Sequence, residues 1–331
     1  MNHFSRKVCI ILAILMTGGP ALFAQKVPTN KYSMKMEQRE DGSYVLQKEK
    51  NYAKIVDLSA IPDLLVPYVH QNDRLTGKLY NKTQTEEFIY KTCDDYELKL
   101  AVDKAVTEKP APVMFYVHGG GWARGNFDSS RSLSKYMAQQ HGITGVRVEY
   151  TLAPQPGANV EVSIQDVLDA VQFIISREKE LNIDPSRIGF LGTSAGGHLA
   201  AVAAMRHPGT KVFVGYSGIY DLTTAKIVQK TKDAQRIEYF EDRDEKVLRE
   251  TSPLYLIPKK TSIAAQLFCG TCDITVECTQ SEEFAAALKR HKAKVDLQVY
   301  QYYDHNLSSK TSDKMEEIFF KTADFIVANL L

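Results

Sequence analysis

The stretch Gly192-Thr193-Ser194-Ala195-Gly196-Gly197 decides how this chain is expected to fold. It follows an apolar run at 188–191 and opens a small-residue helix that extends to about residue 205. It fits the pattern G-x-S-x-G, in which a sharp turn from a strand into a helix exposes a serine at the edge of a sheet. The backbones on either side of the serine approach closely in such a turn, so glycine is required at both positions. The stretch predicts that Ser194 is a nucleophile.

A second glycine-rich stretch, His118-Gly119-Gly120-Gly121-Trp122, follows the apolar run 113–117. Backbone N–H groups in such a loop can face a substrate bound at the serine. We therefore expect Gly120, Gly121 and Ala195 to form an oxyanion hole. Trp122 directly follows the turn, so it either binds substrate or packs beneath the loop as a rigid anchor. Either stretch alone is weak evidence, but both in this order after strands favour a nucleophile with an oxyanion hole.

From residue 86 onward, expected strands alternate with expected helices. This alternation is typical of a mostly parallel sheet covered by helices on both faces. The sequence therefore predicts an α/β fold with an eight-stranded sheet whose first two strands form a hairpin. The strands are expected at 86–92, 96–102, 112–117, 144–150, 187–192, 211–216, 263–268 and 295–301, and the helices at 129–140, 161–180, 194–206, 280–292 and 311–329.

Residues 1–24 have the features of a signal peptide. Arg6 and Lys7 precede an apolar run, and small residues lead to an expected cleavage site after Ala24. The run is too short to span a bilayer, so no stable membrane insertion is expected. We expect an exported protein, periplasmic or extracellular.

The rest of the chain divides into an arm and a main domain. Residues 25–85 are polar with little periodicity and are expected to form an irregular arm packed on the main domain at 86–331. The charged segment 222–260 interrupts the alternation and is expected to be a helical cap insertion, largely solvated.

Composition limits the possible partners. The chain is 44% hydrophobic and 24% charged, and without its leader it has a formal charge of −1. No long basic run occurs, so nucleic acid is not expected as a partner. The oligomeric state does not follow from the sequence.

Four cysteines follow the leader, at positions 93, 269, 272 and 278. Export permits disulfides. A Cys272–Cys278 bridge and buried free thiols are both compatible with the spacing. No histidine lies at ligand spacing from the cysteines, so no metal site is expected.

A serine nucleophile needs a base, and the sequence favours one histidine. His305 follows the last expected strand, at the carboxyl edge where ligands bind in open α/β sheets. It also fits the chain order of serine, acid, then histidine. The other candidates precede the sheet, lie within the glycine motif, or lie on or beside helices: His70, His118, His141, His198, His207 and His291.

The acid is expected after the strand at 263–268, where Asp273 lies. Glu277, Asp296 and Asp304 are rivals with less suitable positions. The expected roles follow the serine-triad template: His305 takes the proton of Ser194 during attack on an ester, and Asp273 orients the imidazole. This chemistry needs no cofactor.

Residues 86–331 resemble the acetyl-esterase and hormone-sensitive-lipase-like branch of the α/β-hydrolase superfamily. The resemblance is carried by the two glycine stretches, Tyr150-Thr151-Leu152-Ala153-Pro154, Asp184-Pro185-Ser186-Arg187-Ile188, Ser252-Pro253-Leu254 and Gly270-Thr271-Cys272-Asp273. It implies an α/β-hydrolase fold and hydrolysis of short-chain esters. Exported relatives commonly deacylate plant polysaccharides as acetylxylan or feruloyl esterases, so the resemblance implies a small-molecule or polysaccharide ester as substrate.

Two other functions remain open. A serine peptidase of the prolyl-oligopeptidase type shares the serine turn and the chain order, but it normally carries a large extra domain. A non-catalytic binding module could keep the fold without hydrolysis, although the presence of His305 argues against it.

Overall fold

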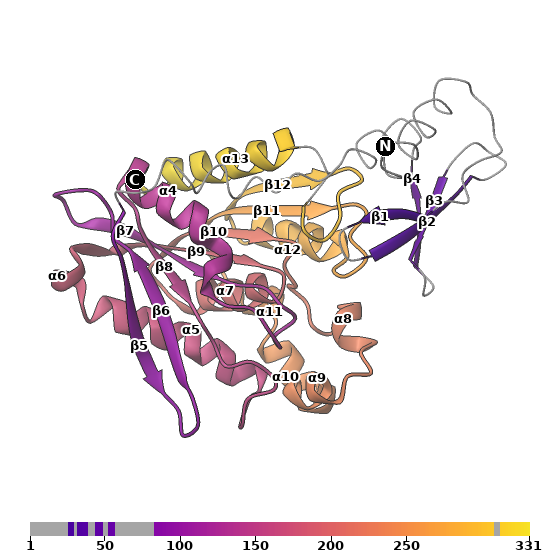
Figure 1. Ribbon diagram of the computed structural model, residues 1–331, viewed down its shortest axis with the longest axis horizontal. Coiled ribbons are helices and arrows are strands. Elements are labelled where there is room, and N and C mark those ends of the chain that lie inside the picture. Colours follow the sequence, from indigo (N-terminus) through magenta and orange to yellow (C-terminus); the bar gives the residue numbers. More distant parts are fainter. Residues whose placement is uncertain (1–25, 30–31, 39–43, 49–51, 57–82, 308–311) are drawn as a thin grey trace, which may run out of the picture. The chain divides into compact units, whose positions relative to one another are not determined.

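The computed structural model describes residues 26–29, 32–38, 44–48, 52–56, 83–307 and 312–331 (Figure 1). The expected signal peptide lies outside these residues. The chain divides into two compact units, 1–67 and 68–331.

The described part of the first unit is an antiparallel sheet of short strands, in the region where the sequence predicts an irregular arm with short pieces of structure. Its strands pair in chain order, β1 Lys26–Thr29, β2 Tyr32–Gln38, β3 Tyr44–Lys48 and β4 Tyr52–Val56. The sequence of β2 alternates Tyr32, Met34 and Met36 with polar residues, which is the period of a strand. The alternation is short and lies in polar surroundings, so it does not predict a sheet from the sequence alone.

The second unit contains the predicted eight-stranded sheet, in the order β12-β11-β10-β9-β7-β8-β6-β5. Strand β6 runs opposite to the other strands of this sheet, so it pairs antiparallel with β5 and β8, and the remaining pairs are parallel. The strands are β5 Thr85–Thr92, β6 Glu97–Asp103, β7 Ala111–Val117, β8 Thr144–Val148, β9 Ile183–Thr193, β10 Thr210–Tyr216, β11 Ala264–Gly270 and β12 Lys294–Tyr300.

Helices cover both faces of this sheet (Figure 1). On one face lie α4 Arg131–His141 and α13 Ser312–Leu330, and on the other α5 Val160–Ile175, α7 Ala195–Arg206 and α12 Cys278–Arg290. The single helix expected at 161–180 is divided, since α5 ends at Ile175 and a short α6 spans Glu178–Leu181. This is the predicted α/β-hydrolase fold.

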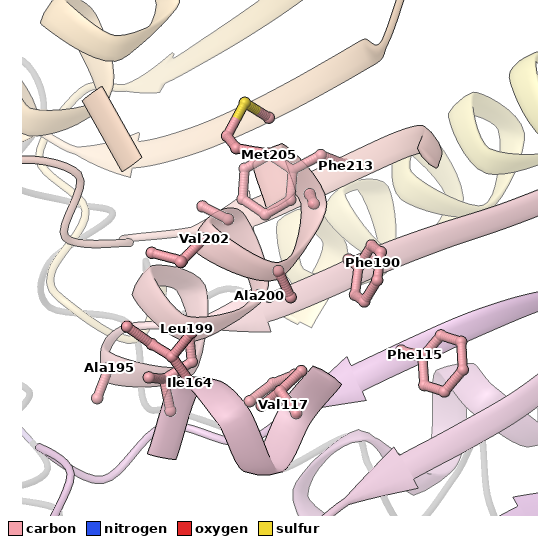
Figure 2. Packing of buried hydrophobic residues seen from close by; sticks show 14 of the residues in the cluster. Phe115, Val117, Ile164, Phe190, Ala195, Leu199, Ala200, Val202, Met205 and Phe213 are labelled. Atoms are coloured by element: carbon pink, nitrogen blue, oxygen red, sulfur yellow. The ribbon is translucent and has the colours of Figure 1, made fainter. Parts of the chain in front are cut away.

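The core is divided by the sheet into two layers because strand side chains alternate between faces. In β7, Phe115 and Val117 face the layer beneath α5 and α7, whereas Met114 and Tyr116 face the layer beneath α4 and α13. Helix α7 is buried along nearly its whole length, and its small residues allow this close approach (Figure 2). Helix α7, which Ser194 precedes directly, is therefore held rigidly.

The parallel strands bring four loops to one edge of the sheet. The glycine loop follows β7, the serine turn follows β9, and the loops with Asp273 and His305 follow β11 and β12. Ligands bind at this edge in open α/β sheets. Segment 222–260 forms short helices after β10: α8 Lys226–Gln229, α9 Ala234–Tyr239, η3 Glu241–Arg243, α10 Glu245–Glu250 and α11 Pro253–Leu256.

Candidate active site

Ser194 lies at a strained turn between β9 and α7, with φ 55° and ψ −123°. A positive φ is costly for a residue with a side chain. Its N–H donates to the carbonyl of Tyr216, 2.8 Å away, which holds the turn against β10. A Cβ on Gly192 would collide with the carbonyl of Gly196, and one on Gly196 would collide with the carbonyl of Val117. Sterics therefore require both glycines of the sequence pattern.

Three predicted residues from distant parts of the chain form a hydrogen-bonded line. Nε2 of His305 lies 2.8 Å from Oγ of Ser194, and its Nδ1 lies 2.7 Å from Oδ2 of Asp273. Ser194 is 7% exposed and Asp273 is 2% exposed. Because the carboxylate accepts from Nδ1, that nitrogen carries the proton and Nε2 is left to accept from the serine hydroxyl. The arrangement can draw the proton from the hydroxyl.

The Asp273 carboxylate is held by backbone donors. Its Oδ1 accepts from the N–H groups of Thr275 and Val276, at 2.8 and 2.9 Å. These bonds leave Oδ2 for the imidazole of His305. The orientation of the acid is therefore set within its own loop.

The loops carrying Asp273 and His305 are joined by backbone hydrogen bonds. The N–H of Thr271 donates to the carbonyl of Tyr300 at 3.0 Å, and the N–H of Cys272 donates to that of Tyr303 at 2.9 Å. A Cβ on Gly270 would collide with the carbonyl of Tyr303, so glycine is required where the loops cross. The relative position of carboxylate and imidazole is thus set by the main chain.

A disulfide joins Cys269 to Cys278 and closes the loop that carries Asp273. The Cys272–Cys278 bridge suggested by the sequence is therefore wrong, and the thiol of Cys272 is buried outside the bridge. Cys269 is the penultimate residue of β11 and Cys278 is the first residue of α12, and the proximity of these two positions in space decides the pairing.

The rival acids have other partners. Glu277 forms an ion pair with Lys226 at 2.8 Å. Asp296 accepts from Gln266 on the neighbouring strand. Asp304 accepts from the backbone N–H of Asn306.

The glycine loop runs directly beside Ser194. A Cβ on Gly119 would lie 2.8 Å from the carbonyl oxygen of Thr193 and 3.3 Å from Cβ of Ser194, so a larger residue would press on the serine. Gly120 and Gly121 have φ of 125° and 64°, which glycine adopts without steric cost. Gly119 has no predicted role in the sequence, although its place in the glycine motif next to Gly120 and Gly121 is a signal for one.

A buried aromatic stack supports the start of this loop. The ring of Tyr150 stacks on His118 at 4.4 Å, and its hydroxyl donates to the His118 carbonyl at 3.0 Å. Nδ1 of His118 lies 2.8 Å from the carbonyl of Gly119. Burial lowers the pKa of His118 to about 4, so the ring is neutral at pH 7. Tyr150 belongs to a motif that sequence reasoning noted without giving it this role.

Trp122 is fully buried beneath the loop and makes no surface for a substrate. Its indole N–H donates to Nδ1 of His198 at 3.2 Å, and Phe240 packs edge-on against the indole at 4.9 Å. Of the two expected roles, the anchor is the one that this burial permits. Tyr239 also contacts Trp122 and donates to Ser163 at 2.8 Å.

These contacts also revise the expectation for the cap insertion. Tyr239 and Phe240 are buried, so α9 is not a merely solvated helix. His198 completes the cluster, because its Nε2 lies 2.8 Å from the carbonyl of Thr251. Burial lowers the pKa of His198 to about 4. The back of the glycine loop thus depends on side chains from the cap.

Neither a metal-binding group nor a membrane-spanning helix occurs among the described residues. No group of three or more His, Cys, Asp or Glu residues there could hold a metal ion. No helix in that part of the chain is both long and apolar enough to cross a membrane.

The strand order, the serine turn and the hydrogen-bonded line together define an α/β-hydrolase. Within this class the chain belongs to the BD-FAE family, whose model matches residues 98–288, more than half of the chain. The matched segment includes Ser194 and Asp273 and ends before His305.

Named relatives match parts of the chain. Arylacetamide deacetylase of Bos taurus is 33% identical over 130 residues, which are 38% of this chain and 32% of that protein. Ethyl acetate hydrolase of Pseudomonas putida is 30% identical over 133 residues, 39% of this chain and 41% of that protein. The chain thus spans less than half the length of these relatives.

A solved structure supports the fold over a longer range. An esterase from the Planctomycetes species Thermogutta terrifontis superimposes with a TM-score of 0.61 and is 23% identical. The match covers 72% of this chain and 90% of that one.

Proposed function

We propose that this protein is a serine carboxylesterase that hydrolyses short-chain acyl esters through an acyl-enzyme. The single observation that carries the proposal is the hydrogen-bonded line from Asp273 through His305 to Ser194. Membership of the BD-FAE family and the hydrolase names of the two relatives support it.

Each residue of the hydrogen-bonded line has its own role in the proposed reaction. Ser194 Oγ attacks the ester carbonyl while Nε2 of His305 takes its proton and then returns it to the leaving alcohol. Asp273 keeps the proton on Nδ1 and stabilises the imidazolium that forms. Water activated by His305 then releases the acyl group and restores the serine.

The negative oxygen of the tetrahedral intermediate is assigned to the N–H groups of Ala195, Gly120 and Gly121. Ala195 is the first residue of α7, and the first N–H groups of a helix have no intrahelical partner. The helix dipole also favours negative charge at this end. Loss of one such donor lowers turnover by about 100- to 1000-fold.

We further propose that the substrate is a carbohydrate ester met outside the cytoplasm. The resemblance to carbohydrate-deacylating esterases supports the substrate class, and the leader-like residues 1–24 support export. The Cys269–Cys278 bridge fits this location, since disulfides persist in oxidising compartments. N-terminal sequencing of the exported protein tests the cleavage after Ala24, and an intact leader would contradict export.

Hydrolysis is tested with the purified protein lacking residues 1–24. It should release 4-nitrophenol from 4-nitrophenyl acetate, and Ser194→Ala should lose nearly all of this activity. Ser176→Ala is the matched control, because this exposed serine lies at the end of α5, away from the site. Equal rates in Ser194→Ala and in the unmodified protein contradict the proposal.

Substrate panels then test the finer statements. Acetylated xylan, feruloylated oligosaccharides and 4-nitrophenyl esters of graded length should show activity on sugar esters and a preference for short acyl chains. A preference for chains of about ten carbons or more points to a lipase. Cleavage of a proline-containing peptide amide without ester turnover points to a peptidase, and binding without any hydrolysis points to a binding module.

A further inference from the structure

One face of the cap helix α9 carries a cation toward the glycine loop. Arg236 precedes Tyr239 and Phe240 by three and four residues, so the three side chains share one face of the helix. Tyr239 and Phe240 pack on Trp122 behind the glycine loop. This packing fixes where the Arg236 side chain can lie.

The guanidinium of Arg236 lies against Gly121. A Cβ on Gly121 would be 3.1 Å from Nη2 of Arg236 and 3.9 Å from Cζ. Glycine therefore leaves room for the cation, and a larger residue there would crowd it. The contact places a positive charge beside the loop that the proposed mechanism uses as an oxyanion hole.

Within the described residues, no acid pairs with this guanidinium. Nε of Arg236 is buried without a hydrogen-bond partner. Asp233, three residues before Arg236, caps α9 by accepting from the backbone N–H of Arg236 at 3.4 Å. The other arginine of the cap that lies close by in sequence, Arg243, is bonded to the carbonyls of Val228 and Thr231. Arg236 therefore differs from Arg243, whose guanidinium is held by hydrogen bonds to backbone carbonyls.

An unpaired, half-buried guanidinium is costly unless a ligand supplies the missing acceptors. Its planar array of donors matches a carboxylate in a bidentate geometry. Arg124, an exposed residue of the same loop, adds positive charge nearby. We infer that Arg236 is a specificity-determining residue that binds a carboxylate carried by the substrate close to its scissile ester. The inference rests on the proposed esterase function.

The distance along the loop limits the substrate. Gly119 adjoins Ser194, and Gly121 is two residues further, a span of at most about 7 Å. The carboxylate must therefore lie within a few bonds of the ester. It belongs either to the acyl part, as in a half-ester of a dicarboxylic acid, or to the alcohol part, as in an acylated hydroxy acid or uronic acid.

Two pairs of esters distinguish these sources. Monoethyl succinate against ethyl pentanoate places the charge on the acyl side, and 4-acetoxybenzoate against its methyl ester places it on the alcohol side. The quantity measured is the ratio of kcat/KM for the charged ester to that for the neutral ester. Arg236→Gln should lower this ratio about 10- to 100-fold in one pair, as expected for loss of a charge-assisted hydrogen bond.

Two variants accompany the test. Arg236→Lys keeps the charge but not the bidentate geometry, so its ratio should be intermediate. Lys246→Gln removes one charge from the cap at a side chain that is 79% exposed, and its ratio should equal that of the unmodified protein. Since each ratio is taken within one protein, partial misfolding cancels.

The outcomes separate this inference from the proposed function. Equal ratios in Arg236→Gln and the unmodified protein, for both pairs, overturn the inference while the esterase stands. If none of the four esters is hydrolysed, the esterase proposal fails. Calorimetric titration of both proteins with monoethyl succinate then decides the role of Arg236, and equal affinities overturn it.

Discussion

The two sides of the candidate site are held in different ways. Asp273 and His305 lie on loops joined by backbone hydrogen bonds, and a disulfide closes the acid's loop. The glycine loop is supported by buried side chains instead, among them Trp122 and residues of the cap. The proton-transfer geometry therefore needs little from the cap, whereas the glycine loop depends on it.

The largest expected loss of activity comes from a substitution at Asp273, on the side of the site that backbone hydrogen bonds hold. Asp273→Asn should keep its backbone bonds through Oδ1 but present an amide N–H to His305, which imposes the wrong tautomer. We expect kcat for 4-nitrophenyl acetate to fall about 10⁴-fold with little change in KM, as in the serine-triad template. Asp296→Asn, on β12, is the control and should retain activity. A loss below ten-fold would remove Asp273 from the mechanism.

On the side-chain-held side, Gly119→Ala should have the next largest effect. The added Cβ would press on the Thr193 carbonyl and on Ser194. A displacement of about 1 Å at a reacting group lowers turnover about 100-fold. Gly157→Ala is the control, because its Cβ would meet no atom within 4 Å, so it adds a methyl group without a collision, although its own φ is positive, at 70°. Equal kcat values for the two variants would contradict this account of the loop.

A fall in pH should lower the stability of the protein through the side of the site that buried side chains support. Burial lowers the pKa of both His118 and His198 to about 4, from an ordinary value of 6.5. The unfolded chain therefore binds more protons between these values, and stability is lost as the pH falls from 6.5 toward 4. Each histidine contributes up to about 3 kcal/mol to this loss.

Urea unfolding at pH 7 and at pH 5 measures this effect. His198→Gln should show a smaller loss of unfolding free energy between the two pH values than the unmodified protein. His291→Gln, whose ring bonds to the Pro258 carbonyl near the surface, is the control and should behave like the unmodified protein. Parallel losses in all three proteins would show that other groups cause the pH dependence.

Removal of the disulfide should have the smallest effect on activity. It tests whether the backbone hydrogen bonds position Asp273 without the bridge. Cys269→Ala with Cys278→Ala should lower the unfolding free energy by about 2–3 kcal/mol, the value for so short a loop. Because the backbone bonds between the loops remain, kcat at 25 °C should change less than about three-fold. Cys93→Ala is the control. A large fall in kcat would show that the bridge itself positions the acid.

The parts of the site that depend on local sequence could be predicted. Ser194 follows from the glycines around it, and His305 and Asp273 follow from chain order and from the edge at which parallel strands end. The sheet follows from the alternation of strands and helices. Each of these features depends only on consecutive residues or on the order of the elements along the chain.

The parts of the structure that depend on contacts between segments distant in the sequence could not be predicted. The Cys269–Cys278 pairing required knowing where β11 and α12 meet. The contact of Arg236 with Gly121 joins segments over a hundred residues apart, and the short cap helices lack the sustained periodicity that would orient their faces. The alternation in strands β1 to β4 is too brief to predict their sheet from the sequence.

The left-handed backbone at Ser194 also has a consequence for engineering. Glycine tolerates φ 55° freely, so Ser194→Gly should relieve a local strain of about 1–3 kcal/mol in the folded protein. A library screened for heat resistance alone would therefore enrich for chains that have discarded this hydroxyl. Thermostable variants of this protein should be selected on turnover and melting temperature together.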